Sequence, residues 1–234
     1  MLTLENLNVR QGDFQLTANV GFAAGQITAL IGPSGAGKST ILSVIAGFYQ
    51  ADGRVLWCCE PITEFRPDQR PVSILFQDNN LFPHLTVSQN VGLALRASLR
   101  LTSAEKRRVD EMLESVGLLG MGARKPAALS GGQQSRAALA RLLLQDRPVI
   151  LLDEPFAALG PGLKQEMLVL VRERALAEGR VVLIVTHDPQ DALAVADQIA
   201  LVDEGQVFAP LPTREVMDNP PDVLRRYLGT STQK

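Results

Sequence analysis

The sequence is short of three things: excess charge of one sign, cysteine and long apolar runs. Lys and Arg together number 23, whereas Asp and Glu number 25, which gives a formal net charge of −2. No long block of like charge is present either. Composition therefore gives no reason to expect nucleic acid as a partner.

The only two cysteines, Cys58 and Cys59, are adjacent, so they cannot join distant segments by a disulfide bond. This cysteine usage is typical of a reducing compartment. The apolar runs, such as residues 181–185, stay far below the roughly 18 residues that a membrane helix needs. The first residues also lack the basic and apolar regions of a secretory signal. We therefore expect a cytoplasmic protein that neither spans a membrane itself nor is secreted.

What remains is the composition of an ordinary folded domain, with 46% hydrophobic and 21% charged residues. A chain of this length buries roughly 70–75% of the surface that it exposes when unfolded, and it is short for two full domains. We therefore expect residues 1–234 to form one domain. The polar end, residues 229–234, is expected to fray.

Short apolar runs that alternate with helical patterns predict an α/β fold with a mainly parallel sheet. These runs are continuously hydrophobic, as strands are when helices cover both faces of a sheet. Alternating apolar residues in two earlier segments, 2–9 and 16–22, predict an antiparallel pair of strands at the start of the chain. The continuous runs occupy residues 27–31, 72–76, 149–152, 181–185 and 199–202.

A helical insertion is predicted in the middle of the chain, because residues 76–149 contain no clear strand pattern. Thr102 and Glu105 have the spacing of a capping box, and apolar residues then recur at helical spacing as far as Val116. We therefore expect residues 78–128 to form a mainly helical subdomain.

The most specific chemical signal is the pattern of a phosphate-binding loop between a predicted strand and a predicted helix. Glycines let the backbone turn around phosphate oxygens, the lysine neutralises their charge, and the serine can bind Mg²⁺. A merely structural glycine-rich turn is the alternative, and the flanking elements disfavour it. We predict nucleotide binding by Gly32, Pro33, Ser34, Gly35, Ala36, Gly37, Lys38, Ser39 and Thr40.

Two carboxylates, Asp153 and Glu154, end the apolar run that begins at residue 149. A parallel sheet would deliver them to its carboxyl edge, beside the phosphate loop. Mg²⁺ would then pair with Asp153, which leaves Glu154 to orient or deprotonate a water that attacks the γ-phosphate. Taken alone, the pair could equally be a polar strand end entering the turn at Pro155, but the neighbouring loop favours the catalytic interpretation.

A second candidate anion site follows Leu129 and consists of Ser130, Gly131, Gly132 and Gln133. Taken alone, this segment is more simply a capping box that opens a helix. In a chain that already has a phosphate loop, a serine and two glycines at a helix N-terminus also suggest a second contact with a nucleotide.

Together these motifs resemble the ATP-binding subunits of ABC transporters, from the first strand to about Val207. The resemblance implies an ABC ATPase architecture, in which the helical subdomain is inserted into a RecA-like core. It implies ATP and Mg²⁺ as cofactors and a head-to-tail dimer of two copies. In that dimer, Ser130, Gly131 and Gly132, with Gln133 beside them, would contact the γ-phosphate held by the partner's Lys38.

The resemblance also assigns two residues that the patterns alone leave open. Gln77 matches the family glutamine that senses Mg²⁺ and the attacking water, and His187 matches the histidine that touches the γ-phosphate. A lone histidine after a strand is more often structural, and His84 has no comparable support. The expected catalytic residues are therefore Glu154, His187 and Gln77, and the expected metal ligands are Ser39, Gln77 and Asp153.

The chain departs from the family pattern at two places. Gly160 stands where the family usually has an aspartate that links the two nucleotide sites, so communication between the sites is in question. The family also stacks adenine on an aromatic residue near the first strand. Val9, Arg10 and Gln11 occupy that neighbourhood here, and Phe14 is the nearest ring.

With no membrane domain of its own, the protein is expected to work on separate integral permease subunits and, through them, with a solute-binding protein. That places it at the cytoplasmic face of the inner membrane. Residues 76–93 and 163–168 resemble the thiamine importers of the family, which makes thiamine the expected solute. The alternatives are another solute, such as a polyamine, an inorganic anion or iron, and a soluble ABC ATPase outside transport. A small-molecule kinase is a further alternative, which we disfavour because it would give residues 129–133 no role.

Overall fold

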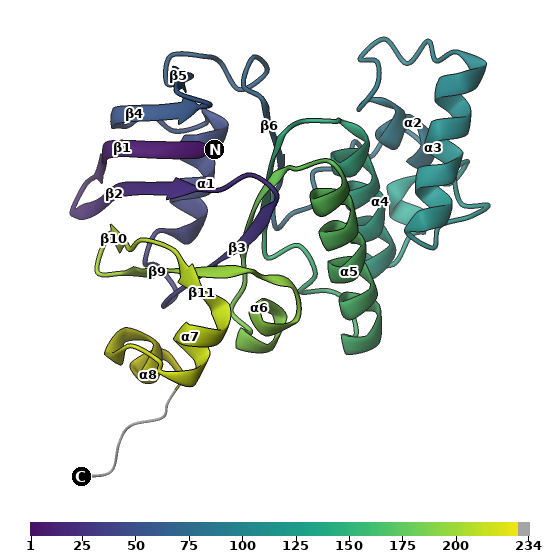
Figure 1. Cartoon of the computed structure of the whole chain (residues 1–234). Coiled ribbons are helices and arrows are strands. Elements are labelled where there is room, and N and C mark those ends of the chain that lie inside the picture. The colour runs from purple at the N-terminus through teal and green to yellow at the C-terminus, as the bar shows by residue number, and fades with distance from the viewer. Residues whose placement is uncertain (229–234) are drawn as a thin grey trace.

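A block of parallel strands forms the centre of the computed structural model, which describes residues 1–228 (Figure 1). The strand order is β9, β3, β8, β7, β6, and each neighbouring pair is parallel. The apolar runs predicted this block, although β6 ends at Leu75 instead of residue 76. The expected fraying of residues 229–234 lies outside the described residues. The bounds are β3 Gln26–Ile31, β6 Val72–Leu75, β7 Val149–Asp153, β8 Val181–Val185 and β9 Gln198–Asp203.

An antiparallel part continues the same sheet beyond β9, and its strands follow outward in the order β2, β1, β4, β5. The short strand β10 joins the two parts, because it pairs with β2 in parallel and with β9 antiparallel. The opening pair β1 and β2 confirms the prediction from alternating residues. The bounds are β1 Leu2–Gln11, β2 Phe14–Phe22, β4 Asp52–Trp57, β5 Glu60–Pro61, β10 Gln206–Val207 and β11 Leu211–Pro212, the last of which pairs with β9.

Helix α1, Lys38–Ala46, packs between the two parts of the sheet. Val149 and Leu151 of β7 share one buried core with α1 and with inward residues of the antiparallel part, such as Leu4 and Leu16. The helix that follows the phosphate loop is therefore held on two sides by apolar surface. The first turn of α1 cannot move far without disturbing this core.

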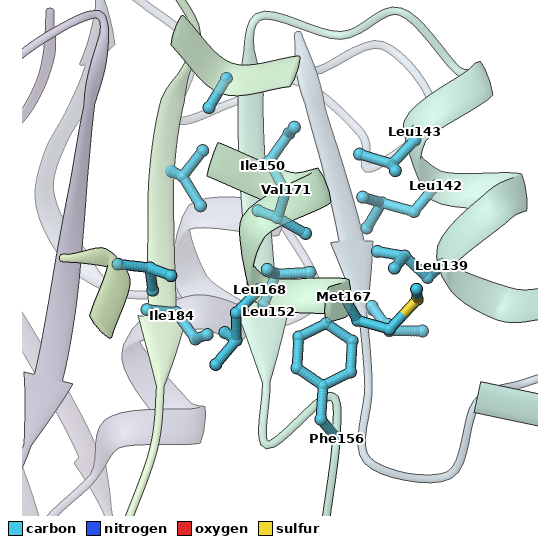
Figure 2. Packing of buried hydrophobic residues seen from close by; sticks show 14 of the residues in the cluster. Leu139, Leu142, Leu143, Ile150, Leu152, Phe156, Met167, Leu168, Val171 and Ile184 are labelled. Atoms are coloured by element: carbon cyan, nitrogen blue, oxygen red, sulfur yellow. The ribbon is translucent and has the colours of Figure 1, made fainter. Parts of the chain in front are cut away.

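The opposite face of the parallel strands packs against α4, Gly131–Leu144, α5, Pro161–Ala177, and α6, Pro189–Val195. Because both faces are covered, β7 and β8 are wholly buried, which explains their continuous apolar runs. Figure 2 shows strand residues packed with helix residues on this second face: Ile150, Leu152, Ile184, Leu139, Leu142, Leu143, Met167, Leu168 and Val171, with Phe156 at the carboxyl end.

The chain between β6 and α4 contains α2, Val87–Gly92, α3, Ser103–Ser115, and a 3₁₀ helix, Pro126–Ala128, but no strand. The predicted capping box is present at α3, where the Glu105 carboxylate accepts a hydrogen bond from the Thr102 amide at 2.8 Å. The bounds proposed for the subdomain, residues 78–128, stay a prediction. Helices α7, Thr213–Asp218, and α8, Asp222–Leu228, follow β11.

No helix of the described chain, residues 1–228, has both the length and the apolar character that a bilayer crossing requires.

Candidate active site

The candidate site residues lie at one edge of the sheet because the parallel strands all end there. The phosphate loop follows β3, Glu154 follows β7, His187 follows β8 and Gln77 follows β6. Since β3, β8, β7 and β6 are neighbours in that order, the segments after them lie side by side. This carboxyl edge is where open α/β sheets generally bind ligands.

The glycines of the phosphate loop are required by close approach and by backbone conformation. A Cβ at Gly32 would overlap the backbone carbonyl oxygen of Val202. Gly37 has a φ of 102°, and a Cβ there would lie 2.8 Å from Cζ of Phe14 and 3.0 Å from Cδ1 of Leu16. The loop therefore sits against β9 on one side and against β2 on the other, in a conformation that side chains would disturb.

Lys38 is the first residue of α1, and its ammonium turns back into the loop. Its Nζ donates hydrogen bonds to the carbonyl oxygens of Gly32 and Pro33, both at 2.7 Å. Burial lowers the pKa of Lys38, and the charges of Glu154 and Asp153 oppose that shift. The loop thus holds a partly desolvated cation among its own backbone groups. Such an arrangement is suited to binding phosphate oxygens.

Ser39 and Asp153 form the next pair, because the serine hydroxyl donates to Oδ1 of Asp153 at 2.9 Å. The pKa of Asp153 is raised overall, mainly by burial and also by the Glu154 carboxylate. The Ser39 hydrogen bond and the Lys38 charge act in the opposite direction. These two oxygens fit a Mg²⁺ site of the kind that takes one carboxylate, nucleotide phosphates and waters. Within residues 1–228 no cluster of three His, Cys, Asp or Glu side chains offers an all-protein metal site.

Glu154 and His187 are brought together from neighbouring strands. Oε2 of Glu154 lies 3.4 Å from Nδ1 of His187. The backbone of Glu154 has a φ of 46°, which is rare outside glycine, and its amide donates to the carbonyl of Val185 at 3.2 Å. This strained backbone directs the chain out of β7 and is the kind of outlier that is found at functional sites.

Gln77 is exposed and immediately follows Phe76, whose ring packs edge to face with Phe48 at 5.4 Å between centroids. The next turn is tied to α4, since the Arg141 guanidinium donates to the carbonyls of Asn79 and Asn80 at 3.1 and 2.8 Å. The segment that carries Gln77 is therefore linked to the helix that begins after Ser130. Sequence patterns alone did not reveal this link.

Ser130 and Gln133 form the predicted capping box of α4. The Ser130 hydroxyl accepts from the Gln133 amide at 3.3 Å, and Oε1 of Gln133 accepts from the Ser130 amide at 3.0 Å. Ser130 and Gly131 are exposed. Within residues 1–228, every hydrogen bond of Ser130 goes to its own helix, so no such bond joins it to the phosphate loop of the same chain.

A cluster beside His187 was not predicted as part of the site. It joins Lys164 of α5 to Asp188 and Asp191 at the start of α6, and Asp191 also accepts from the Thr186 hydroxyl at 2.7 Å. Asp188 before Pro189 has the sequence of a helix N-cap, which was the one available signal. The long-range pairing with Lys164 becomes visible only in the fold.

The geometry and the sequence comparisons agree on the class of protein. The profile of the family described as ABC transporter matches residues 17–157, and this chain belongs to that family. Among its curated relatives are the thiamine import ATP-binding proteins, named ThiQ, of Ruegeria sp. (strain TM1040) and Cereibacter sphaeroides. They are 56% and 55% identical to it over 230 residues, which are 98% of this chain and 100% of each relative.

Solved structures confirm the predicted ABC ATPase fold. A dimeric ATP-binding cassette in a post-hydrolysis state with ADP and Pi has a TM-score of 0.81 and 29% identity, and covers 92% of this chain and 99% of its own. A nucleotide-free cassette from an ABC transporter has a TM-score of 0.84 and 28% identity, with 97% of this chain and 98% of its own covered.

Proposed function

We propose that this chain binds and hydrolyses ATP and couples hydrolysis to thiamine import through separate membrane permease subunits. The observation that carries the proposal is the single sheet edge that brings together Lys38, the Ser39 and Asp153 pair, and the Glu154 and His187 pair. The thiamine assignment is supported by relatives that match over nearly the whole chain.

ATP binding is assigned to the phosphate loop, residues 32–40. Backbone amides of the loop and of the first turn of α1 would surround the phosphates, because the N-terminus of a helix favours anions. The Lys38 ammonium now contacts the carbonyls of Gly32 and Pro33 and is close enough to the loop to neutralise phosphate oxygens instead.

Ser39, Asp153 and Gln77 are the proposed residues around Mg²⁺. When bound, Mg²⁺ supplies positive charge that offsets the negative charge of the phosphate oxygens during transfer. Asp153 is held for this purpose at the end of a wholly buried strand, and Ser39 already fixes one of its oxygens. Gln77 is exposed and follows β6 at the same edge of the sheet.

Hydrolysis is assigned to Glu154 with help from His187. The Glu154 carboxylate would orient a water and accept its proton while the water oxygen attacks the γ-phosphorus and the bond to ADP breaks. His187 lies at 3.4 Å from that carboxylate and would contact the γ-phosphate. Both residues follow closely after the ends of β7 and β8, two neighbouring strands that the core covers on both faces.

A second copy of the chain completes the proposed site. The exposed N-terminus of α4, with Ser130, Gly131 and Gly132, would face the ATP bound to the partner subunit. The solved cassette in a post-hydrolysis state is described as a dimer bound to ADP and Pi. Assembly would thus place two ATP molecules between two copies, which makes hydrolysis depend on the dimer.

Thiamine uptake in cells tests the function as a whole. In the proposal, the dimer binds permease subunits at the cytoplasmic face of the inner membrane, and these receive thiamine from a solute-binding protein. A strain that lacks this chain should lose thiamine uptake, the wild-type chain should restore it, and Glu154→Gln should not. Normal thiamine uptake with loss of polyamine, anion or iron uptake would instead assign another cargo.

Replacing Gly160 by aspartate should change the cooperativity of hydrolysis more than ATP affinity. Gly160 is the N-cap of α5, with φ −68° and ψ 158°, and no atom lies within 4 Å of an added Cβ. The chain therefore tolerates a side chain, and Asp as N-cap adds a few tenths of a kcal/mol to stability. The readout is the Hill coefficient of the assembled transporter, with Gly162→Asp as the control. An unchanged coefficient would show that Gly160 does not weaken communication between sites.

Phe14 is the proposed contact for the adenine base, since its ring end lies against Gly37. Stacking of a base on a ring contributes about 1–3 kcal/mol, so Phe14→Ala should weaken ATP binding by roughly 10-fold. Inorganic triphosphate, which has no base, should bind the variant and the wild type equally well. An equal loss of affinity for ATP and for triphosphate would show that Phe14 only supports the loop. Phe208→Ala is a control for loss of an exposed ring.

A further inference from the structure

The ion-pair cluster beside His187 connects the two chain segments that carry the proposed hydrolytic residues. Lys164 lies in the first turn of α5, which begins shortly after Glu154 in the chain. Its ammonium lies 2.6 Å from Oδ1 of Asp191 and 3.1 Å from Oδ2 of Asp188, and both aspartates follow His187 in the chain.

The residues on both sides of His187 are fixed by this cluster. Thr186 donates its hydroxyl hydrogen to Oδ2 of Asp191 at 2.7 Å, and the same hydroxyl oxygen accepts from the Asp188 amide at 3.0 Å. Asp188 in turn caps α6 by accepting from the Gln190 amide at 3.0 Å. His187 is thus the central residue of a turn whose two neighbours are held.

Lys164 supplies the positive charge of the cluster. Only 19% of its side chain and 9% of that of Asp191 are exposed, so the pair is largely removed from water. Within residues 1–228, it is the only Lys or Arg that forms an ion pair with either aspartate. Without Lys164, the nearly buried Asp191 carboxylate would lack a counter-ion. The turn of His187 would then be expected to rearrange so that water can solvate this carboxylate.

The surroundings of Lys164 and Asp188 favour their charged forms. Burial lowers the pKa of Lys164, but hydrogen bonds and charges from Asp191 and Asp188 outweigh it and raise the pKa overall. The hydrogen bond from the Gln190 amide and, after it, the contact with Lys164 keep the pKa of Asp188 below its ordinary value, although burial opposes them. Lys164 and Asp188 therefore remain charged at neutral pH.

We propose that Lys164 is a positioning residue for hydrolysis: through Asp188 and Asp191 it holds the turn of His187 at a fixed place relative to Glu154. The inference rests on the proposed function of that pair. Because α5 begins directly after residues 157–160, the same contact links the His187 turn to the end of the segment that follows β7. Lys164 need not touch the nucleotide to have this effect.

The test is the steady-state kinetics of Lys164→Ala in the full chain assembled with its permease subunits. Misplacing a reacting group by about 1 Å can cost 10²-fold, so we expect kcat to fall roughly 10- to 100-fold. The KM for ATP and the affinity for a non-hydrolysable analogue should stay within about 3-fold, since the phosphate loop is not altered. Lys164→Arg, which keeps the charge, should recover most of kcat, and Lys106→Ala on the exposed face of α3 is the control.

A double-mutant cycle with His187→Ala separates positioning from general damage. If Lys164 acts through His187, adding Lys164→Ala to His187→Ala should cause little further loss of kcat. Additive losses, an unchanged kcat in Lys164→Ala, or a KM that rises in proportion would each overturn the proposal. A wild-type transporter that does not hydrolyse ATP would overturn the proposed function itself, which is a distinguishable result.

A second variant covers the case in which Lys164→Ala does not fold. Lys164→Met combined with Asp191→Asn removes both charges of the buried pair, so that no unpaired charge remains inside. This chain should melt near the wild-type temperature and still show the lower kcat. Wild-type kcat in the double variant would show that the ion pair does not position His187.

Discussion

Glu154→Gln should slow ATP hydrolysis by roughly 10²- to 10⁴-fold while ATP still binds, because general-base catalysis contributes about that much. The substitution keeps the size of the side chain and removes only its ability to accept a proton. Lys38 and the Ser39 and Asp153 pair, which belong to the phosphate end of the site, stay unchanged. The measurements are single-turnover hydrolysis and ATP binding by the purified chain.

Glu166→Gln is the matched control, because it makes the same chemical change at an exposed position of α5. It should leave hydrolysis within 2-fold of the wild type. If Glu154→Gln hydrolyses ATP at the wild-type rate, Glu154 does not handle the attacking water, and the assignment at the end of β7 fails.

Gly131→Asp should abolish most hydrolysis without preventing ATP binding to the single chain. An added Cβ at Gly131 meets only Cβ of Ala158, at 3.8 Å, so the monomer has room for a side chain. An acidic residue in the first turn of α4 is also favourable for the helix. In the proposed dimer, however, the same carboxylate would face the γ-phosphate of the partner subunit's ATP. Loss of one such anion contact typically costs 10²- to 10³-fold, and we expect at least about that decrease.

Gly179→Asp controls for the added charge, since Gly179 lies before β8, at the amino edge of the sheet, and has open space around it. Asp tolerates its positive φ of 60° better than most residues do. Hydrolysis by Gly179→Asp should be normal. A Gly131→Asp chain that also hydrolyses ATP normally would show that this end of α4 does not contact a nucleotide.

The parts of the fold that the sequence predicts are those in which local pattern and burial agree. Strands β3, β7 and β8 are wholly or almost wholly buried and read as continuous apolar runs, and α1 begins at the lysine of the loop motif. Strand β4 was not predicted, because its first residues, Asp52, Gly53 and Arg54, are exposed and only its second half enters the core.

The candidate site was predicted in part for a similar reason. Its loop, carboxylates and capping box are consecutive residues, so their spacing carries the information. The links made by Lys164 and Arg141 join segments that are distant in sequence, and the approach of Phe14 to Gly37 depends on how β2 lies over the loop. Such contacts depend on packing, and no local pattern specifies them.

The most direct test of the central claim is the mass of the Glu154→Gln chain in solution with saturating ATP and Mg²⁺, measured by light scattering during size exclusion. Two copies that share their ATP should elute as a dimer, and adding Gly131→Asp to the same chain should return it to a monomer with ATP still bound. A monomer in the first case, loaded with ATP, would contradict a site built from two copies.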